Sequence, residues 1–199
     1  MEIASLRSGF DTLDRLGGID AVEEYVSCLG KYMSHRLQSL HHSNGVALVQ
    51  LNGMHYANPA RQSAIASFQL VKPEPSHGSP YFSYRRAALV LAEAGFQLRD
   101  GCACCPGACY RASNVTEREV RDKATKAKGD YTDWQYVERG AERLPLGALR
   151  ASLGWLSRAE DVDALVDFLA RTYIDTAEDI EPTMTTSGKG GNDASRFGC

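Results

Sequence analysis

The sequence predicts a protein of the α+β class, with a small mixed or antiparallel sheet packed against helices. Two segments, 19–40 and 157–173, carry apolar residues at steps of three and four, which is typical of amphipathic helices. Two other segments, 46–51 and 64–71, are apolar and are separated by a polar loop, so we expect them to be neighbouring strands. Strands joined by a short loop, with helices between the remaining strands, favour one sheet covered by helices.

The first helix and the loops around the first strands follow from breaker residues. Gly17 and Gly18 precede the helix at 19–40. His, Ser, Asn and Gly at 41–45 predict a turn into the first strand. Segment 72–80 contains three prolines and a glycine, so we expect it to be a surface loop.

The middle of the chain predicts a second helix at 84–94 and a short strand at 96–99. Asn114 followed three residues later by Glu117 predicts the N-terminus of a third helix. Segment 148–156 is expected to be the last strand.

The C-terminal helix is expected to open with a capping box formed by Ser157 and Glu160. Beyond residue 174 the composition changes to Thr, Ser, Gly and Asp, which cannot bury enough apolar surface to fold alone. We therefore expect one domain at 1–174 and a disordered, flexible tail at 175–199. The face of the C-terminal helix expected to be buried consists of Val162, Leu165, Val166, Leu169 and Tyr173.

Composition excludes several classes of function. The formal charge of -3 gives no reason to expect nucleic acid or an anionic membrane as a partner. The first residues lack the basic and apolar regions of a secretory signal, and no apolar run approaches the roughly 18 residues of a spanning helix. A cytoplasmic protein is expected, in which clustered thiols are more often catalytic or metal-binding than paired in disulfides.

The sequence GCACCPGACYR, residues 101–111, places four of the six cysteines within eight positions. The segment lies between an expected strand and an expected helix, where a helix N-terminus favours thiolate over thiol. Gly101 permits close backbone approach, and Pro106 with Gly107 predicts a tight turn. Arg99 and Arg111 flank the segment and are expected to lower the pKa of a thiol. The four cysteines are Cys102, Cys104, Cys105 and Cys109.

These residues alone leave three interpretations open: sulfur handling or catalysis, metal binding, and a redox pair or bystander thiols. Strong zinc patterns use two separated pairs of ligands, and no second cysteine cluster exists here. His41 and His42 lie in the expected turn, where histidines are more often solvated than ligating.

Longer segments carry a resemblance to a known family. RDGCACCPGAC at 99–109 resembles the cysteine loop of class V aminotransferase cysteine desulfurases, and more closely that of the molybdenum cofactor sulfurases. LPLGALRASLGWLSRAEDVDALVDFL at 144–169 is similar to a second family segment. Three upstream segments, GFDTLDRLGG, LQSLHHSNGVALVQL and AIASFQLV, correspond to family segments in the same order. The resemblance covers roughly residues 5–172.

The resemblance implies the small, C-terminal domain of an enzyme with the pyridoxal-phosphate aminotransferase fold. Cys104 falls at the position of the cysteine that forms the persulfide, and Arg150 at that of the arginine that holds the substrate carboxylate. Arg99 is assigned with Arg150 to substrate binding. Cys105 and Asp100 depart from the residues usual in the family, asparagine and threonine. The accessory thiols expected to relay a persulfide are Cys102, Cys105 and Cys109.

The Schiff-base lysine of the family lies in a large domain, and none of the six lysines here lies in a matching segment. Pyridoxal phosphate is therefore implied by the family but not expected to bind this chain alone. The first hypothesis is a partial or split sulfurase that uses L-cysteine and molybdenum cofactor with a separate large-domain polypeptide. The second is a stand-alone persulfide carrier, and the third a thiolate metal-binding module. A face that would meet a large domain is a candidate for homodimerisation.

Overall fold

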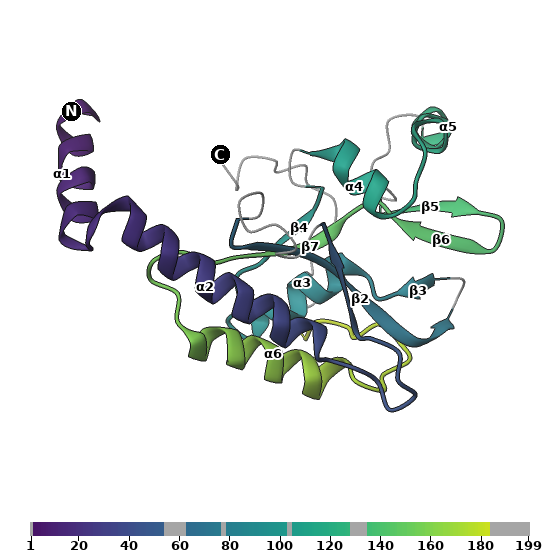
Figure 1. Cartoon of the computed structure of the whole chain (residues 1–199). Coiled ribbons are helices and arrows are strands. Elements are labelled where there is room, and N and C mark those ends of the chain that lie inside the picture. Colours follow the sequence, from purple (N-terminus) through teal and green to yellow (C-terminus); the bar gives the residue numbers. More distant parts are fainter. Residues whose placement is uncertain (1, 54–62, 77–78, 103–104, 128–134, 184–199) are drawn as a thin grey trace.

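The computed structural model describes residues 2–53, 63–76, 79–102, 105–127 and 135–183. Helices and strands follow each other in a mixed order along the chain (Figure 1). The helices are α1 Glu2–Arg15, α2 Gly18–Gln38, α3 Tyr84–Glu93, α4 Pro106–Ala112, α5 Glu117–Ala127 and α6 Ala159–Tyr173. The strands are β1 Val49–Asn52, β2 Ile65–Ser76, β3 Ser79–Tyr81, β4 Arg99–Gly101, β5 Tyr136–Arg139, β6 Glu142–Pro145 and β7 Ala148–Ser152.

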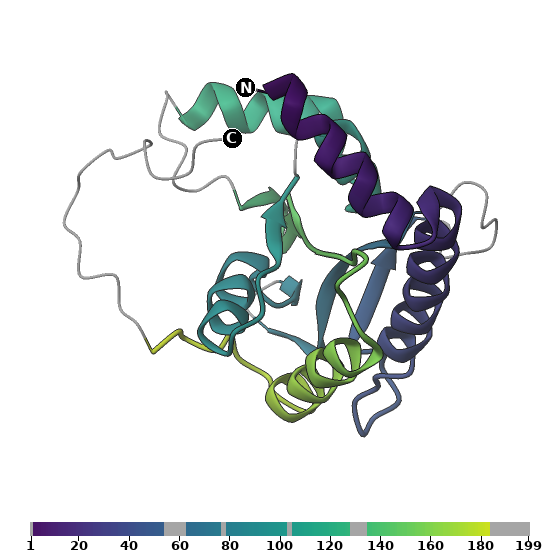
Figure 2. The same cartoon turned by 90° about the vertical axis from the view of Figure 1, so that its left-hand side faces the viewer.

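The main sheet is antiparallel throughout. Its strand order is β1-β2-β7-β4, and β3 pairs with the far end of β2. One face of the sheet packs against α2, α3 and α6, which Figure 2 shows surrounding it. Phe68 of β2 and Leu149 of β7 lie directly opposite each other on this face, and both side chains are fully buried. The α+β class and the small sheet covered by helices are confirmed.

A second, smaller apolar cluster forms where the β5–β6 hairpin meets α4 and α5. Val115, Val137 and Leu146 are its buried residues. Arg139 of β5 donates from Nε to Glu119 of α5 at 2.7 Å, which ties the hairpin to the helix. Because α4 contains the second half of the cysteine segment, this unit fixes the end of that segment.

The long helices agree with the sequence pattern. The structure confirms the helices expected at 19–40, 84–94 and 157–173 within a few residues. All five residues expected on the inner face of α6 are buried. α1, to which no pattern was assigned, projects from the start of α2 with Phe10 65% exposed (Figure 1).

For the described residues, the expectation of a surface loop at 72–80 is wrong. β2 continues to Ser76 and β3 follows at Ser79–Tyr81, while Lys72 is only 4% exposed. β1 and β7 pair with the first part of β2. The Val71 N–H still donates to Leu48 O at 2.7 Å, and beyond that point the described strand that pairs with β2 is β3. Prolines, which cannot donate to a ladder, are tolerated where a strand has one neighbour. The expected strand at 96–99 is shifted, since β4 begins at Arg99.

Both expected capping boxes are displaced along the chain. Asn114 adopts a positive φ of 54° and does not cap α5. Thr116 does so, because its Oγ1 accepts from the Glu119 N–H at 3.3 Å while the Glu119 carboxylate accepts from the Thr116 N–H at 2.8 Å. At α6 the backbone N–H of Arg158 donates to Asp161 Oδ2 at 2.9 Å.

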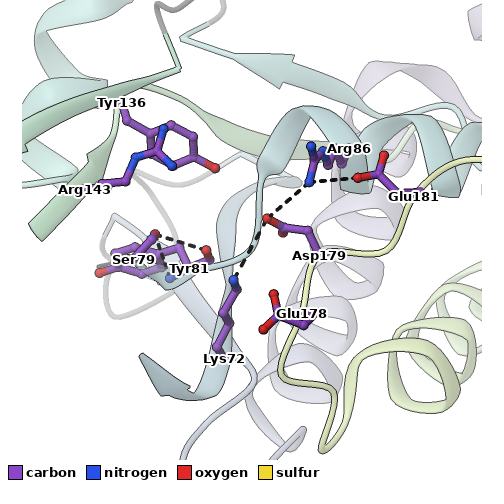
Figure 3. A pocket seen from close by; sticks show the side chains of 9 residues that line it. All are labelled: Lys72, Ser79, Tyr81, Arg86, Tyr136, Arg143, Glu178, Asp179 and Glu181. Atoms are coloured by element: carbon purple, nitrogen blue, oxygen red, sulfur yellow. Dashed lines mark hydrogen bonds and ion pairs between the residues drawn. The ribbon is translucent and has the colours of Figure 1, made fainter. Parts of the chain in front are cut away.

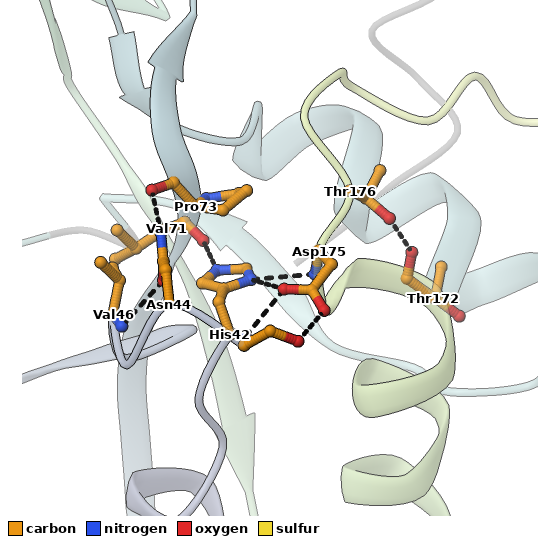
Figure 4. A network of polar contacts seen from close by, with 9 residues as sticks. His42, Asn44, Val46, Val71, Pro73, Thr172, Asp175 and Thr176 are labelled. Atoms are coloured by element: carbon orange, nitrogen blue, oxygen red, sulfur yellow. Dashed lines mark hydrogen bonds and ion pairs between the residues drawn. The ribbon is translucent and has the colours of Figure 1, made fainter.

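The first residues of the expected tail belong to the folded unit, because the chain after α6 returns to the core. The backbone N–H of Asp175 donates to Nδ1 of His42 at 3.0 Å, and the Asp175 carboxylate accepts from Ser43 (Figure 4). The opposite ring nitrogen of His42, Nε2, donates to Val71 O at 2.8 Å. The expectation of a solvated His42 is therefore wrong, because this side chain is a buried structural link. Residues 184–199 lie outside the described residues.

Among the described residues, no helix has the length and apolar character needed to cross a membrane.

Candidate functional site

A row of four polar residues crosses the main sheet from edge to edge. The register places Asn52 of β1 opposite Ser67 of β2. It also places Ser67 opposite Arg150 of β7, and Arg150 opposite Arg99 of β4. Residues that are directly opposite in an antiparallel sheet point to the same face. Because the next residues along β2 and β7 point into the core, this row lies on the other face of the sheet.

The two arginines at the end of the row carry like charges at neighbouring positions. Directly opposite residues have Cβ atoms about 4.5–5.5 Å apart. Nε of Arg150 is buried and has no hydrogen-bond partner. Within the described part of the chain, no carboxylate forms an ion pair with Arg99 or Arg150. A guanidinium with a buried, unpartnered Nε beside a second guanidinium suits a bidentate planar anion such as a carboxylate.

Close backbone packing connects this row to the cysteine segment. Gly101, at the end of β4, has a positive φ of 85°, which favours glycine. A Cβ atom on Gly147, just before β7, would lie 2.7 Å from Cα of Gly101 and 2.7 Å from the Tyr84 ring. Only glycine at 147 allows the start of β7 to approach β4 this closely. A Cβ on Gly101 itself would meet nothing within 4 Å, so glycine is favoured at 101 by its positive φ and at 147 by the close approach.

Gln69 links the same face of the sheet to the end of α4. Its side chain is buried, and Nε2 donates to Ser113 Oγ at 3.0 Å and to Gly147 O at 3.4 Å. Sequence reasoning did not single out Gln69, Ser67 or Asn52. The available signal was the placement of polar residues within otherwise apolar strands.

Two thiols of the segment converge on one carbonyl group. The Cys102 thiol donates to Leu146 O, and Cys109 Sγ lies 3.6 Å from the same oxygen. Cys109 Sγ also lies 4.0 Å from Gly101 O. Cys102 follows β4 and Cys109 lies on α4, so the pair joins the two elements that border the segment.

The two thiols ionise as a pair. A hydrogen bond from Cys102 lowers the pKa of Cys109, although burial opposes this shift. The same hydrogen bond, together with burial, raises the pKa of Cys102. Cys109 therefore loses its proton before Cys102 does. Neither Arg99 nor Arg111 is among the causes of these two pKa shifts, which come from the thiols and from burial. The same expectation for Cys104 falls outside the described residues.

No family model matches the chain. The chain does match individual curated proteins. Over 182 residues it is 32% identical to molybdenum cofactor sulfurase 2 of Culex quinquefasciatus, which covers 86% of this chain and 23% of that protein. Over 187 residues it is 31% identical to the molybdenum cofactor sulfurase of Drosophila melanogaster, covering 88% of this chain and 23% of that protein. The chain is homologous to one portion of the molybdenum cofactor sulfurases.

A solved structure agrees on the fold. The apo structure of cysteine desulfurase from Thermococcus onnurineus NA1 matches with a TM-score of 0.52 at 15% identity, over 82% of this chain and 28% of that one. The expected fold is thereby confirmed for this sulfurase homologue. The chain spans about a quarter of the length of the curated relatives it matches (25% and 23% for two of them).

The remaining residues expected in the site lie partly outside the described structure. Cys104, the expected nucleophile, falls outside the described residues. Cys105 is exposed and stands just before α4. Pro106 and Gly107 are the first residues of α4, so the tight turn expected there is instead the first turn of a helix.

The described residues of the sulfurase homologue do not fit pyridoxal phosphate as a resident group. That cofactor requires a lysine for its Schiff base. Lys72, the described lysine on the main sheet, is buried on the core face and faces Asp179 at 4.0 Å. The other described lysines are Lys31 on α2 and Lys123 and Lys126 on α5, so none lies on the strands of the arginine row. Likewise, the described residues contain no group of three His, Cys, Asp or Glu side chains that could hold a metal ion.

Proposed function

We propose that this chain supplies the carboxylate-binding arginines and the sulfur-accepting thiol of a sulfur-transfer site. L-Cysteine is the sulfur donor, Cys104 carries the sulfur as a persulfide, and molybdenum cofactor is the acceptor. The observation that carries the proposal is the pairing of Arg99 with Arg150, because Arg99 begins the same short strand that leads into the cysteine segment.

The arginine pair selects the substrate class. A single α-carboxylate can accept two hydrogen bonds from one guanidinium, and the second guanidinium compensates the remaining charge. Nε of Arg150, buried and without a partner, offers a donor that is already desolvated. Binding a carboxylate removes the repulsion between Arg99 and Arg150, so the like charges favour the bound state.

The thiols divide the transfer among themselves. Cys104 is the residue before Cys105 in the sequence, and Cys105 immediately precedes α4. Cys102 and Cys109, which lie close to the same carbonyl oxygen, stand on either side of them in the segment. A thiolate is the nucleophilic form of cysteine, and the hydrogen bond from Cys102 favours the thiolate of Cys109. We infer that the Cys109 thiolate attacks the outer sulfur of a Cys104 persulfide, which forms a new S–S bond on Cys109, breaks the old one and releases Cys104 as a thiolate. Cys102 and Cys105 are accessory thiols.

The group that activates the substrate comes from outside the described residues. If it is pyridoxal phosphate, it is held by another part of a longer protein or by a separate large-domain polypeptide. Among the described residues, the helices of the main core pack on the opposite face of the sheet, so the arginine row is the surface on which such a domain would place its substrate.

Reconstitution tests the proposal directly. The chain is mixed with a pyridoxal-phosphate large domain of a cysteine desulfurase and L-cysteine, and protein persulfide is measured by mass spectrometry. We expect persulfide on this chain and its loss in Cys104→Ala. In Arg150→Ala we expect half-maximal persulfide formation to require a higher concentration of L-cysteine. Arg118→Ala, on the exposed surface of α5, is the control. Wild-type persulfide formation in Cys104→Ala would refute the assignment of the acceptor thiol.

A persulfide carrier is the second candidate. The observation that favours it is the lack of a described lysine beside the arginine row, since a carrier needs thiols but no Schiff base. A carrier would accept sulfur from an already persulfidated desulfurase at the same rate in the wild type and in Arg150→Ala. A requirement for Arg150 in that transfer would exclude it in favour of the first candidate.

A further inference from the structure

Gln69 on β2 is a buried amide that contacts two groups next to the thiol pair, Cys102 and Cys109. The residue is 2% exposed, and Nε2 donates to Ser113 Oγ at 3.0 Å and to Gly147 O at 3.4 Å. Oε1 is also buried, and among the described residues it has no hydrogen-bond partner. A buried polar atom without a partner costs free energy, so packing alone does not explain an amide at this position.

The first contact ends at the last turn of α4, the helix that carries Cys109. Ser113 is the C-cap residue of α4 and stands four positions after Cys109, so the two residues lie on the same face of the helix. The Ser113 N–H donates to Cys109 O at 3.1 Å. The hydrogen bond from Gln69 to Ser113 therefore holds this face of α4 against the sheet.

The second contact ends one residue beyond the carbonyl group on which the two thiols converge. Leu146 O accepts from the Cys102 thiol and lies 3.6 Å from Cys109 Sγ, and Gly147 follows directly in the sequence. Two planar peptide groups joined at one Cα carry these two carbonyls, so the position of Gly147 O limits that of Leu146 O. Gln69 therefore contacts both the helix that carries one thiol and the backbone that accepts from the other.

Gln69 also lies on the face of the sheet that carries the arginine row. It stands two residues beyond Ser67, which is roughly 7 Å along an antiparallel strand. Ser67 in turn is directly opposite Arg150 on β7. The same strand therefore sets the separation between the proposed carboxylate site and the thiol pair.

We propose that Gln69 is the positioning residue of the thiol pair, which holds Cys109 in place relative to Cys102 and to the arginine row. It acts through Ser113 and Gly147, without contact to substrate and without gain or loss of a proton. The proposal rests on the proposed function in one respect, that Cys109 receives sulfur. The placement itself is a property of this chain and can be measured without sulfur transfer.

The pH profile of alkylation tests the placement. The full chain reacts with iodoacetamide over a range of pH, and fragment-ion mass spectrometry locates the label on Cys109 within the cysteine segment. Gln69→Met removes the amide without removing an ionisable group, so a changed profile reports a changed position of the thiols. The hydrogen bond from Cys102 lowers the pKa of Cys109, and its loss should move the profile upward, toward 9.0. Circular dichroism checks that the variant is folded.

Gln50→Met is the matched control. Gln50 stands on β1 directly opposite Gln69, and its amide oxygen accepts from the Tyr81 hydroxyl at 3.0 Å rather than contacting α4. Figure 3 shows Tyr81 in the polar cavity between β3 and the β5–β6 hairpin. We expect the alkylation profile of Cys109 in Gln50→Met to match that of the wild type.

A double-mutant cycle separates positioning from a general loss of stability. If Gln69 acts through Ser113, Ser113→Ala alone should move the Cys109 profile in the same direction as Gln69→Met, and the double variant should move it no further. Because both partners of one buried hydrogen bond are then absent, the double variant should be at least as stable in urea as Gln69→Met. A profile that returned to that of the wild type together with stability would refute positioning.

Reconstitution with a pyridoxal-phosphate large domain and L-cysteine separates this inference from the proposed function. In Gln69→Met we expect persulfide on Cys104 at the wild-type level and passage of sulfur to Cys109 slowed by at least about tenfold, because small misplacements of reacting groups are costly. An unchanged Cys109 profile in folded Gln69→Met and Ser113→Ala would overturn the positioning role, even where sulfur transfer succeeds. A shifted profile in a chain that forms no persulfide would support the positioning role and refute the sulfur-transfer function.

Discussion

Arg99 and Arg150 stand directly opposite each other on β4 and β7, although 51 positions separate them in the sequence (150 minus 99). Like charges at directly opposite positions destabilise a sheet. No described carboxylate pairs with either residue, so the folded chain retains this repulsion until an anion binds. The pair therefore couples the stability of the sheet to occupancy of the proposed carboxylate site.

Removal of one charge should stabilise the ligand-free protein. We expect Arg99→Gln to raise the free energy of unfolding by roughly 0.2–1 kcal/mol in low salt, measured by urea denaturation. The gain should shrink in high salt, because screening already weakens the repulsion in the wild type. Arg118→Gln, on the exposed face of α5, should change stability by less than about 0.5 kcal/mol. A less stable Arg99→Gln would mean that Arg99 makes a favourable contact.

Substitution of Gly147 should be costly. A Cβ at this position would meet the backbone of Gly101 and the Tyr84 ring at 2.7 Å, and neither is the end of a flexible side chain. We expect Gly147→Ala to lower the free energy of unfolding by about 1–3 kcal/mol, the usual cost of overpacking. Gly154→Ala is the matched control, since nothing lies within 4 Å of its added Cβ. Equal stability of the two variants in urea would contradict the close approach.

The helices could be predicted because a 3.6-residue pattern is local. The inner face of α6 is readable from five apolar residues alone, and all five are buried. The strands were harder, since their ends depend on partners. β2 extends to Ser76 because β3 pairs with it there, and the β5–β6 hairpin was not expected although Gly140 marks its turn with a φ of 63°.

The sequence identified residue types for a candidate site, but it could not predict their contacts. The cysteine cluster and Arg150 were identified from motifs, whereas the row through Ser67 and Asn52 depends on a register that links four strands. His42 shows the same limit in the fold. Its burial requires Val71 and Asp175, which are 29 and 133 positions away.

Glu119 should make stability depend on acid. The hydrogen bond from Arg139, followed by those from Thr116, lowers the pKa of Glu119 from 4.5 to about 2. Since the folded pKa is the lower one, its contribution is complete above about pH 4.5 and is lost as the pH falls toward 2. We expect Glu119→Gln to reduce stability at pH 7 by about 0.5–1 kcal/mol and to flatten its decline between pH 5 and 2.

Urea denaturation at several pH values measures this effect. Glu117 pairs with Arg121 on the same helix and is more exposed than Glu119. We therefore expect Glu117→Gln to reduce stability at pH 7 by less than Glu119→Gln does. If Glu119→Gln and the wild type lost stability in parallel between pH 5 and 2, the carboxylate would not be the group responsible.

The thiol pair should show itself in the pH dependence of alkylation. The hydrogen bond from Cys102 lowers the pKa of Cys109, so Cys102→Ala should raise that pKa toward its ordinary value of 9.0 and slow the reaction of Cys109 with iodoacetamide at pH 8. Cys102→Ser keeps a donor at the same position and should retain most of the wild-type rate. Cys105→Ala is the control from the same segment, because Cys105 is not among the causes of the Cys109 shift. Peptide-resolved mass spectrometry follows Cys109 separately from the other thiols. An unchanged pH profile in Cys102→Ala would show that the two sulfurs do not share a proton, and Cys109 would then lose its place as the thiolate that receives sulfur.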